Sequence, residues 1–135
     1  DALDGRPGVR SARYARESWP EGTARGVVDQ ANTAKLLADL VDIAPGARGA
    51  RFVCSLALAE PTGRVLIDTK GTIEGSIANA PRGTNGFGYD PIFFIPELAK
   101  TAAELSAEEK NAISHRGKAI GKLKPLLKEL IESET

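Results

Sequence analysis

The sequence contains no methionine, one cysteine and one histidine among its 135 residues. The single cysteine, Cys54, cannot form an internal disulfide, and it lies in an apolar run, where a lone cysteine acts as a small hydrophobic side chain. With one histidine and one cysteine there is no His/Cys spacing for zinc, no Ser–His–Asp set and no Walker loop. These absences argue against disulfide-stabilised, zinc-dependent and P-loop proteins.

Charge of one sign is not in excess, because 18 Lys and Arg residues balance 18 Asp and Glu residues. No overall positive field therefore favours DNA, RNA or an anionic membrane, and phosphate must be bound by a local cluster. No apolar run approaches the roughly 18 residues of a membrane span, and no basic-plus-apolar leader opens the sequence. Together with the lone cysteine, these features predict a cytoplasmic protein without a membrane partner.

The hydrophobic share of 41% supports a real core, and the length fits one domain over residues 1–135. Turn residues make residues 1–22 irregular, with at most a short helix near 11–16. Apolar spacing and breakers predict a helix over 29–42, strands over 50–59, 64–71, 72–78 and 92–95, and a helix from Ala107 that breaks or bends at 114–117 and near Pro125. This order indicates an α/β domain with a mixed, twisted β-sheet and flanking helices.

Residues 86–93 (GFGYDPIF) set two aromatic rings, two glycines and a carboxylate around a turn. Phe87 and Tyr89 offer flat faces to a base, and stacking on such a ring contributes about 1–3 kcal/mol. Gly88 between them lets a ligand approach the backbone. The alternative is that both rings belong to the core and Gly88 forms a bulge. Asp90 either accepts a hydrogen bond from a base or ribose, or caps its own turn.

Residues 106–118 (SAEEKNAISHRGK) hold three cationic or titratable candidates, Lys110, His115 and Arg116. On a continuous helix Lys110 and His115 would point roughly 140° apart, so they converge on one ligand only if the helix bends near Ser114. Arginine presents two donors to a carbonyl or phosphate, whereas lysine acts as a point charge. The alternative is a solvated basic face. The residues alone therefore indicate a base pocket without a reactive centre.

Three segments together resemble the inosine/xanthosine triphosphate pyrophosphatase family: residues 83–93 (GTNGFGYDPIF), 103–119 (AELSAEEKNAISHRGKA) and 2–15 (ALDGRPGVRSARYA). The resemblance covers essentially the whole chain. It implies hydrolysis of ITP, dITP and XTP to the monophosphate and pyrophosphate. It also implies a two-lobed α/β fold, Mg²⁺ dependence and a homodimer. The balanced charge, separately, predicts no nucleic-acid partner.

By matching position, the resemblance implies a substrate-binding set of Phe87, Gly88, Tyr89, Asp90, Lys110, His115 and Arg116. Phe87 would stack on the base, Asp90 would contact the ribose or base edge, and Lys110 would neutralise phosphate or fix the base. Donors from His115 or Arg116 would pair with the 6-oxo group of a deaminated purine. An amine at that position leaves the donors unpaired, and such a mismatch can reject a ligand by about 10⁴-fold.

The sequence departs from the family in what precedes Asp1. Family members begin with a strand and a triphosphate-binding loop, followed by a metal-binding glutamate and an Asp-Asp-Ser-Gly-Leu segment with the acid that activates water. None of these is in the sequence, so we expect an N-terminally truncated domain with no catalytic residue and no metal ligand of its own. The alternative to an enzyme is a non-catalytic remnant that binds purine nucleotides or forms dimers.

Overall fold

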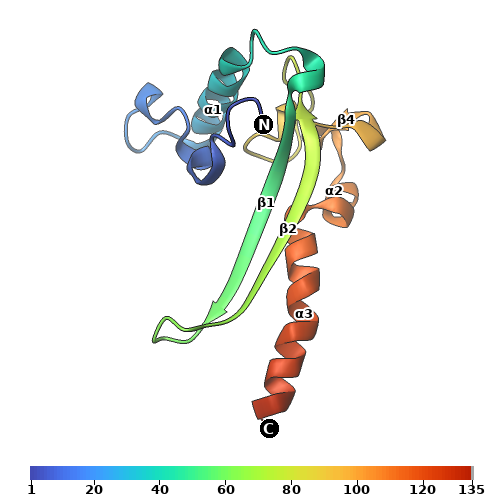
Figure 1. Ribbon diagram of the computed structural model, residues 1–135. Coiled ribbons are helices and arrows are strands. Elements are labelled where there is room, and N and C mark those ends of the chain that lie inside the picture. Colours follow the sequence, from blue (N-terminus) through green and yellow to red (C-terminus); the bar gives the residue numbers. More distant parts are fainter. Residues whose placement is uncertain (135) are drawn as a thin grey trace. The chain divides into compact units, whose positions relative to one another are not determined.

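The computed structural model describes residues 1–134 as a mixed α/β chain (Figure 1). Its helices and strands are α1 Arg25–Asp39, β1 Gly49–Ala59, β2 Val65–Ile77, β3 Phe93–Ile95, β4 Lys100–Thr101, α2 Ala107–Ile113 and α3 His115–Glu134. The sheet order is β1-β2-β3-β4, and β3 pairs antiparallel with both of its neighbours. The predicted fold class, an α/β domain with a sheet and flanking helices, is confirmed.

The chain divides into two compact units. Unit 1 comprises Asp1–Ala50 and Gly75–Ala107, and unit 2 comprises Arg51–Glu74 and the chain from Glu108 onward. Strands β1 and β2 contribute residues to both units. None of the helices described in residues 1–134 is long and apolar enough to cross a bilayer.

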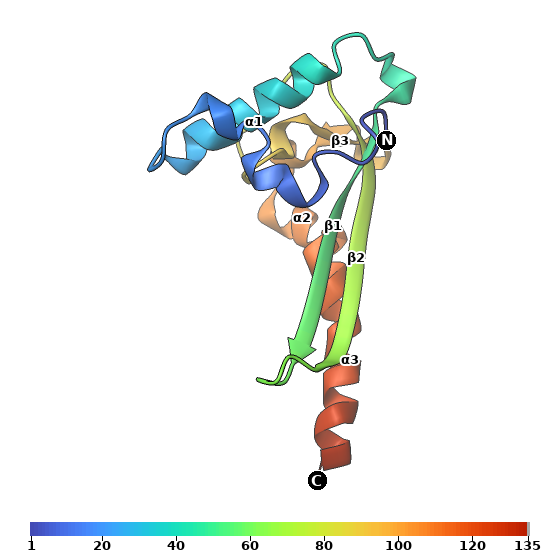
Figure 2. The ribbon, with the colours of Figure 1, turned by 60° about the vertical axis from the view of Figure 1, so that its left-hand side comes forward.

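The core of unit 1 forms where α1 packs its apolar stripe against residues from the sheet and its connections. Leu36, Leu40, Ile77 and Ile92 form the buried cluster, with Leu3, Tyr14 and Tyr89 packed against it. Both ribbon views place the N-terminal segment, which includes a 3₁₀ helix at Gly8–Arg13, beside α1 (Figures 1 and 2). The segment is held there by Asn32, which accepts from Ala15 N–H (2.8 Å) and donates to Ala12 O (3.1 Å).

Helix α1 begins four residues before the predicted start and ends three residues before the predicted end. Its N-terminus carries no side-chain cap, so no Ser, Thr, Asp or Asn marks it in the sequence. At the other end, Arg48 donates to the carbonyl of Leu40, the C-cap residue, and to that of Ile43, which lies four residues beyond the helix. A bond from a side chain eight residues after the cap has no simple sequence pattern.

Unit 2 is built on the hairpin of β1 and β2 and on α3, which packs beside β2. Burial alternates along residues 52–58 of β1 as predicted, and the turn closes through Glu60 N–H to Arg64 O (2.9 Å). Three side chains tie α3 to β2: Thr69 Oγ1 donates to Ala119 O (3.0 Å), Lys118 Nζ to Thr72 O (3.0 Å) and Lys122 Nζ to Lys70 O (2.7 Å). The lysine ammonium groups thus satisfy strand carbonyls that lie beyond the short β2–β3 ladder.

The predicted separate strand over 72–78 is wrong, because β2 runs without a break from Val65 to Ile77. Its glycines serve close packing rather than a turn. A Cβ at Gly71 would collide with the backbone of His115 and Ala119, and one at Gly75 would lie 2.5 Å from Phe94 O. Of the predicted break or bend near Pro125, the break is wrong, since Pro125 lies inside α3. The strand over 92–95 and the helix start at Ala107 are confirmed to within one residue.

Candidate functional site

The aromatic–glycine loop, defined here as residues 83–90, is part of unit 1 and is fixed at both ends. Gly83 has φ +89° and lies against Ala103 so closely that a Cβ there would overlap its carbonyl group. Asn85 donates from Nδ2 to Leu105 O (3.0 Å), and its N–H donates to Ala103 O (2.9 Å). Gly88 has φ +61°, and a Cβ built on it would meet no atom within 4 Å. The loop backbone is therefore held, while the space beside Gly88 is open.

The two rings of this loop have different surroundings. Phe87 is 54% exposed, which is unusual for so large an apolar ring. Tyr89 packs against the core cluster of unit 1, and its hydroxyl donates to Ser11 O (2.6 Å). Burial, together with the nearby Tyr14 and Asp29, raises the pKa of the Tyr89 hydroxyl. Of the two rings, Phe87 is therefore the more accessible, and Tyr89 packs against the core, while contact of either ring with a ligand remains a prediction.

Asp90 is buried, with 4% of its surface exposed. Its Oδ2 accepts from the N–H of Phe87 (3.1 Å), so the carboxylate closes the turn that carries the exposed ring. This is the turn-capping alternative weighed for an Asp-Pro pair. A contact between Asp90 and the ribose or base edge remains a prediction.

Sequence reasoning missed Asp29, a residue of α1 that reaches the loop across 59 positions of sequence. Asp29 Oδ2 accepts from Gly88 N–H (3.0 Å). The other oxygen, Oδ1, lies 2.9 Å from Arg25 Nε, but the angle is not that of a hydrogen bond. Among the described residues Oδ1 is thus a buried acceptor with an ionic neighbour and no hydrogen-bond donor. No local pattern in the sequence marks this contact.

The second predicted set belongs to unit 2, where the structure places it at a break between two helices. Lys110 lies on α2, and His115 and Arg116 are the first two residues of α3. Between the helices, Ser114 accepts from Gly117 N–H at its Oγ (2.9 Å), and its carbonyl accepts from Lys118 N–H (3.0 Å). Ser114 therefore caps α3, and the predicted break of the helix at this point is confirmed.

His115 stacks on a second aromatic ring of unit 2. The ring centroids of His115 and Phe52 lie 5.2 Å apart with an interplanar angle of 28°. Such offset stacking fixes the plane of the imidazole. The side chain of His115 is half-buried, while Arg116 is exposed. The structure thus brings His115 and Arg116 together at one helix start and brings residues 87–90 together in one loop.

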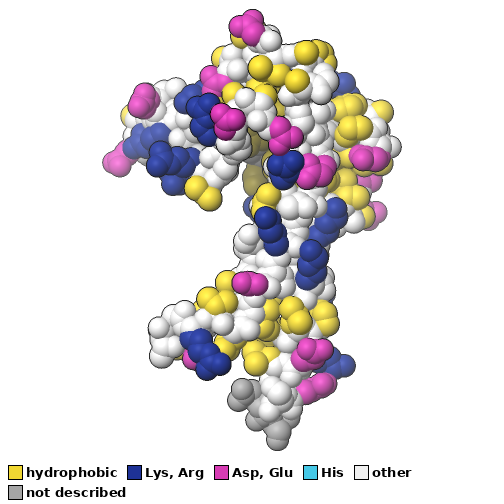
Figure 3. All heavy atoms as spheres, viewed as in Figure 1, with side chains coloured by type: hydrophobic (Ala, Val, Ile, Leu, Met, Phe, Trp, Pro, Cys, Tyr) yellow, Lys and Arg dark blue, Asp and Glu magenta, His cyan; other side chains and the backbone are white. Residues whose placement is uncertain are grey.

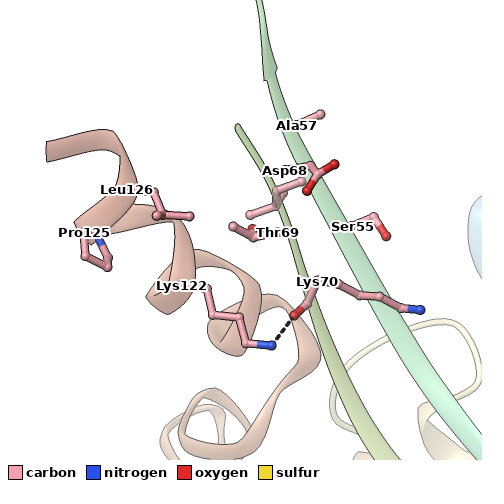
Figure 4. Close-up of a pocket in the computed structure, with 9 residues that line it drawn as sticks. Ser55, Ala57, Asp68, Thr69, Lys70, Lys122, Pro125 and Leu126 are labelled. Carbon is pink, nitrogen blue, oxygen red and sulfur yellow. Dashed lines mark hydrogen bonds between the residues drawn. The ribbon is translucent and has the colours of Figure 1, made fainter. Parts of the chain in front are cut away.

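The hollow shown in Figure 4 is not formed by the predicted site residues. It has a volume of about 820 Å³ and lies in unit 2, between β1, β2 and α3, with Thr69, Lys70, Lys122 and Leu126 among its lining residues. The ammonium group of Lys122 is already engaged with Lys70 O. Charges of both signs are interspersed over the face shown in Figure 3, in agreement with the net charge of zero.

Within residues 1–134 no group of three or more His, Cys, Asp or Glu side chains is placed to hold a metal ion. The residues present therefore do not fit a magnesium site by themselves.

A pH-dependent stability follows from Tyr14, whose hydroxyl donates to Asp39 Oδ2 on α1. Burial and this bond raise the pKa of Tyr14 to about 12. A raised pKa means that the folded state favours the protonated phenol. The stabilisation is therefore complete below the unfolded pKa of 10 and is lost as the pH rises towards 12. We expect the free energy of unfolding, measured with urea between pH 8 and 11.5, to fall more steeply above pH 10 for the wild type than for Tyr14→Phe. Parallel curves would contradict this role.

The fold and the two motif-bearing sets define the class of protein. The Ham1 family model matches residues 1–126, and the chain belongs to the Ham1 family.

Particular relatives carry more specific names. A dITP/XTP pyrophosphatase of Exiguobacterium sibiricum is 54% identical over 127 residues, covering 94% of this chain and 60% of the relative. Among solved structures, a HAM1 protein from Coxiella burnetii matches with a TM-score of 0.81 and 43% identity over 95% of this chain and 61% of its own. The Staphylococcus aureus Ham1 protein matches with a TM-score of 0.78 and 44% identity over 99% and 62%. The chain thus spans about three fifths of the relatives it matches.

Proposed function

We propose that this chain acts in a nucleoside triphosphate pyrophosphatase that hydrolyses deaminated purine nucleotides (ITP, dITP and XTP) to the monophosphate and pyrophosphate. The names of the relatives support the substrate class. The observation that carries the proposal is the 54% exposed ring of Phe87, presented by a loop whose backbone is bonded from both sides. An exposed ring on a rigid support suits stacking on a purine, because little conformational entropy remains to be lost on binding.

The family resemblance assigns both sets to recognition of the nucleotide, and the proposal keeps that assignment. Phe87 stacks on the base, and the open space beside Gly88 leaves room for the base. His115 and Arg116 donate to the 6-oxo group, and the stacking of His115 on Phe52 holds the imidazole plane for that purpose. Lys110 binds phosphate or the base, and Asp90 contacts the ribose or base edge. Tyr89 supports the loop by packing against the core of unit 1. An adenine amine offers no acceptor to the donors at 115 and 116, so adenosine nucleotides are rejected.

Magnesium dependence belongs to the proposal through the family resemblance. Because the described residues supply no cluster of ligands for the ion, we derive no step of the hydrolysis through it. What these residues supply is base recognition.

The remaining parts of the proposal concern partners and location. We propose a homodimer with no nucleic-acid partner, for which the balanced charge and the family resemblance are the support. A cytoplasmic location is supported by the single free cysteine, Cys54. The second candidate function is a chain that binds purine nucleotides or forms dimers without turnover, and it would use the same loop and helix-start residues.

Two measurements on the 135-residue chain separate these functions, with the Exiguobacterium sibiricum relative as the positive control. Calorimetric titration with IMP and AMP reports binding, and pyrophosphate release from ITP with Mg²⁺ reports turnover. Turnover of ITP supports the pyrophosphatase. Binding of IMP in preference to AMP without turnover supports the base-recognition role that the pyrophosphatase proposal gives these residues, and equal binding of IMP and AMP without turnover supports the non-catalytic chain. If neither IMP nor AMP binds and ITP is not turned over, both candidates are overturned.

A further inference from the structure

We propose that Asp29 is a positioning residue for nucleotide binding: its carboxylate on α1 holds the aromatic–glycine loop in the conformation that presents Phe87. This inference rests on the proposed function, because it assigns a role in the same base-recognition loop. The residue is not part of any of the three motifs that suggested the function from sequence.

The first support is the geometry at Gly88. A residue at φ +61° in an open loop is free to change conformation unless its backbone groups are bonded. The N–H of Gly88 is bonded to Asp29 Oδ2 at 3.0 Å. Asp29 is 86% buried at its side chain, since only 14% is exposed, and a charge-assisted bond in such surroundings is roughly twice as strong as one between neutral groups.

The second support is that α1 holds the loop at two successive residues. Asp29 bonds Gly88 directly, and Tyr89 donates to Ser11 O in a segment that Asn32 of α1 fixes through Ala12 and Ala15. Both attachments lie within unit 1. Immediately before them, Phe87 N–H is bonded to Asp90. At three successive residues of the loop, two N–H groups and one hydroxyl are thus bonded to protein acceptors. The Phe87 side chain is the exposed part of this stretch.

The third support is that the ion pair of Asp29 with Arg25 is weak. Its ion pair with Arg25 is made at an angle unfit for a hydrogen bond, and Arg25 is 59% exposed, where ion pairs contribute little. Burying a carboxylate costs free energy that a mainly solvent-screened partner does not offset. The bond to Gly88 is therefore the contact that accounts for an aspartate here.

The test measures the loop bond and nucleotide binding separately on the 135-residue chain. Phe-Gly occurs once in the sequence, at 87–88, so labelling phenylalanine with ¹³C at the carbonyl and glycine with ¹⁵N gives a single linked amide signal, that of Gly88. Binding is measured by calorimetric titration with IMP. The variants are Asp29→Ala, which removes the acceptor, and Asp29→Asn, which keeps a neutral oxygen acceptor. Asp42→Ala removes one exposed carboxylate from the same unit and is the matched control.

In Asp29→Ala we expect the Gly88 amide proton to shift upfield and to exchange faster with solvent, and the affinity for IMP to fall roughly tenfold. Asp29→Asn should restore the amide signal and bring the affinity to within about threefold of the wild type. Asp42→Ala should change neither. An unchanged Gly88 signal in Asp29→Ala, or a changed signal with unchanged IMP affinity, overturns the inference.

Failure of the proposed function can be told apart from failure of the loop bond. If the wild type does not bind IMP, the proposed function is overturned, and the binding role of Asp29 with it, while the Gly88 signal still reports the bond by itself. Alanine is a good helix former, so Asp29→Ala should fold. If it does not, Asp29→Glu replaces it, because one extra methylene displaces the carboxylate while keeping the charge. Equal IMP affinity of Asp29→Glu and the wild type then counts against the inference.

Discussion

Replacing both His115 and Arg116 by alanine is expected to abolish most of the preference for inosine over adenosine nucleotides. In the proposed site these side chains are the donors that pair with the 6-oxo group, and a buried polar mismatch is what rejects the amine of adenine. The preference of IMP over AMP should therefore fall from about 10⁴-fold to within about tenfold. Titration calorimetry with both nucleotides measures the two affinities on the same chain.

The loss should be specific to the oxo-purine. IMP affinity should drop while AMP affinity stays nearly constant, because AMP makes no use of the two donors. Arg116→Lys keeps the charge but loses the planar pair of donors, so it should recover only part of the preference. Lys124→Ala, which removes an exposed cation from the same helix, is the control and should leave the ratio unchanged. A parallel fall in IMP and AMP affinity would show instead that the pair binds phosphate.

Several features of this fold were predictable because their causes are local. The hairpin follows from alternating apolar residues on both sides of a Pro-Thr-Gly turn, and the turn is closed by Glu60 and Arg64. The helix break at Ser114 follows from a serine three residues before a glycine, and it is what frees Lys110 from a continuous helix with His115. The family was predictable for the same reason, since its motifs are contiguous segments.

Other features depend on contacts between distant residues and leave no pattern in the sequence. No residue near Gly71 in the sequence indicates that this glycine must leave room for the backbone of α3. From local pattern alone, a glycine between two apolar runs predicts the end of a strand. Pro125 predicts a break or a bend from local chemistry, yet the helix continues through it as part of α3. The bond from Asp29 to Gly88 and the distinction between exposed Phe87 and packed Tyr89 needed the tertiary structure.

Arg48 leads to the largest expected effect on stability. It is a buried arginine, 7% exposed, and within the described part of the chain its guanidinium bonds carbonyl oxygens rather than an acid. The bonds go to Leu40 O (2.7 Å), Ile43 O (3.0 Å) and, more weakly, Ala78 O (3.4 Å). Leu40 is the C-cap of α1, where a cation is also favoured by the helix dipole, and Ile43 lies four residues beyond the end of the helix. Removing the side chain takes a donor from each of these carbonyls, of which Leu40 O keeps another, the N–H of Ile43 (2.9 Å).

We therefore expect Arg48→Ala to lower the free energy of unfolding by about 3 kcal/mol, measured by urea denaturation, and Tm by roughly 10 °C. Arg48→Met fills the space without donating, so it separates the lost bonds from the cavity and should be nearly as destabilising. Arg48→Lys, with one compact donor group, should recover a minority of the loss. Arg64→Ala, at an exposed turn position, should cost less than about 0.5 kcal/mol. A loss below about 1 kcal/mol in Arg48→Met would show that the carbonyls find other donors.

Comparison of Arg48 with Asp29 separates the stability of unit 1 from the positioning of its loop. Both residues bond α1 to a later part of the chain, Arg48 at the C-terminal end of the helix and Asp29 near its start. Only Asp29 bonds the loop that carries Phe87. Well below the Tm, Arg48→Met should therefore bind IMP with nearly wild-type affinity despite its low stability, whereas Asp29→Ala should bind weakly despite a smaller loss of stability. A specific bond to Gly88 must affect IMP binding beyond its effect on folding. If the loss of IMP affinity matched the loss of stability in both variants, the role of α1 would be limited to keeping unit 1 folded.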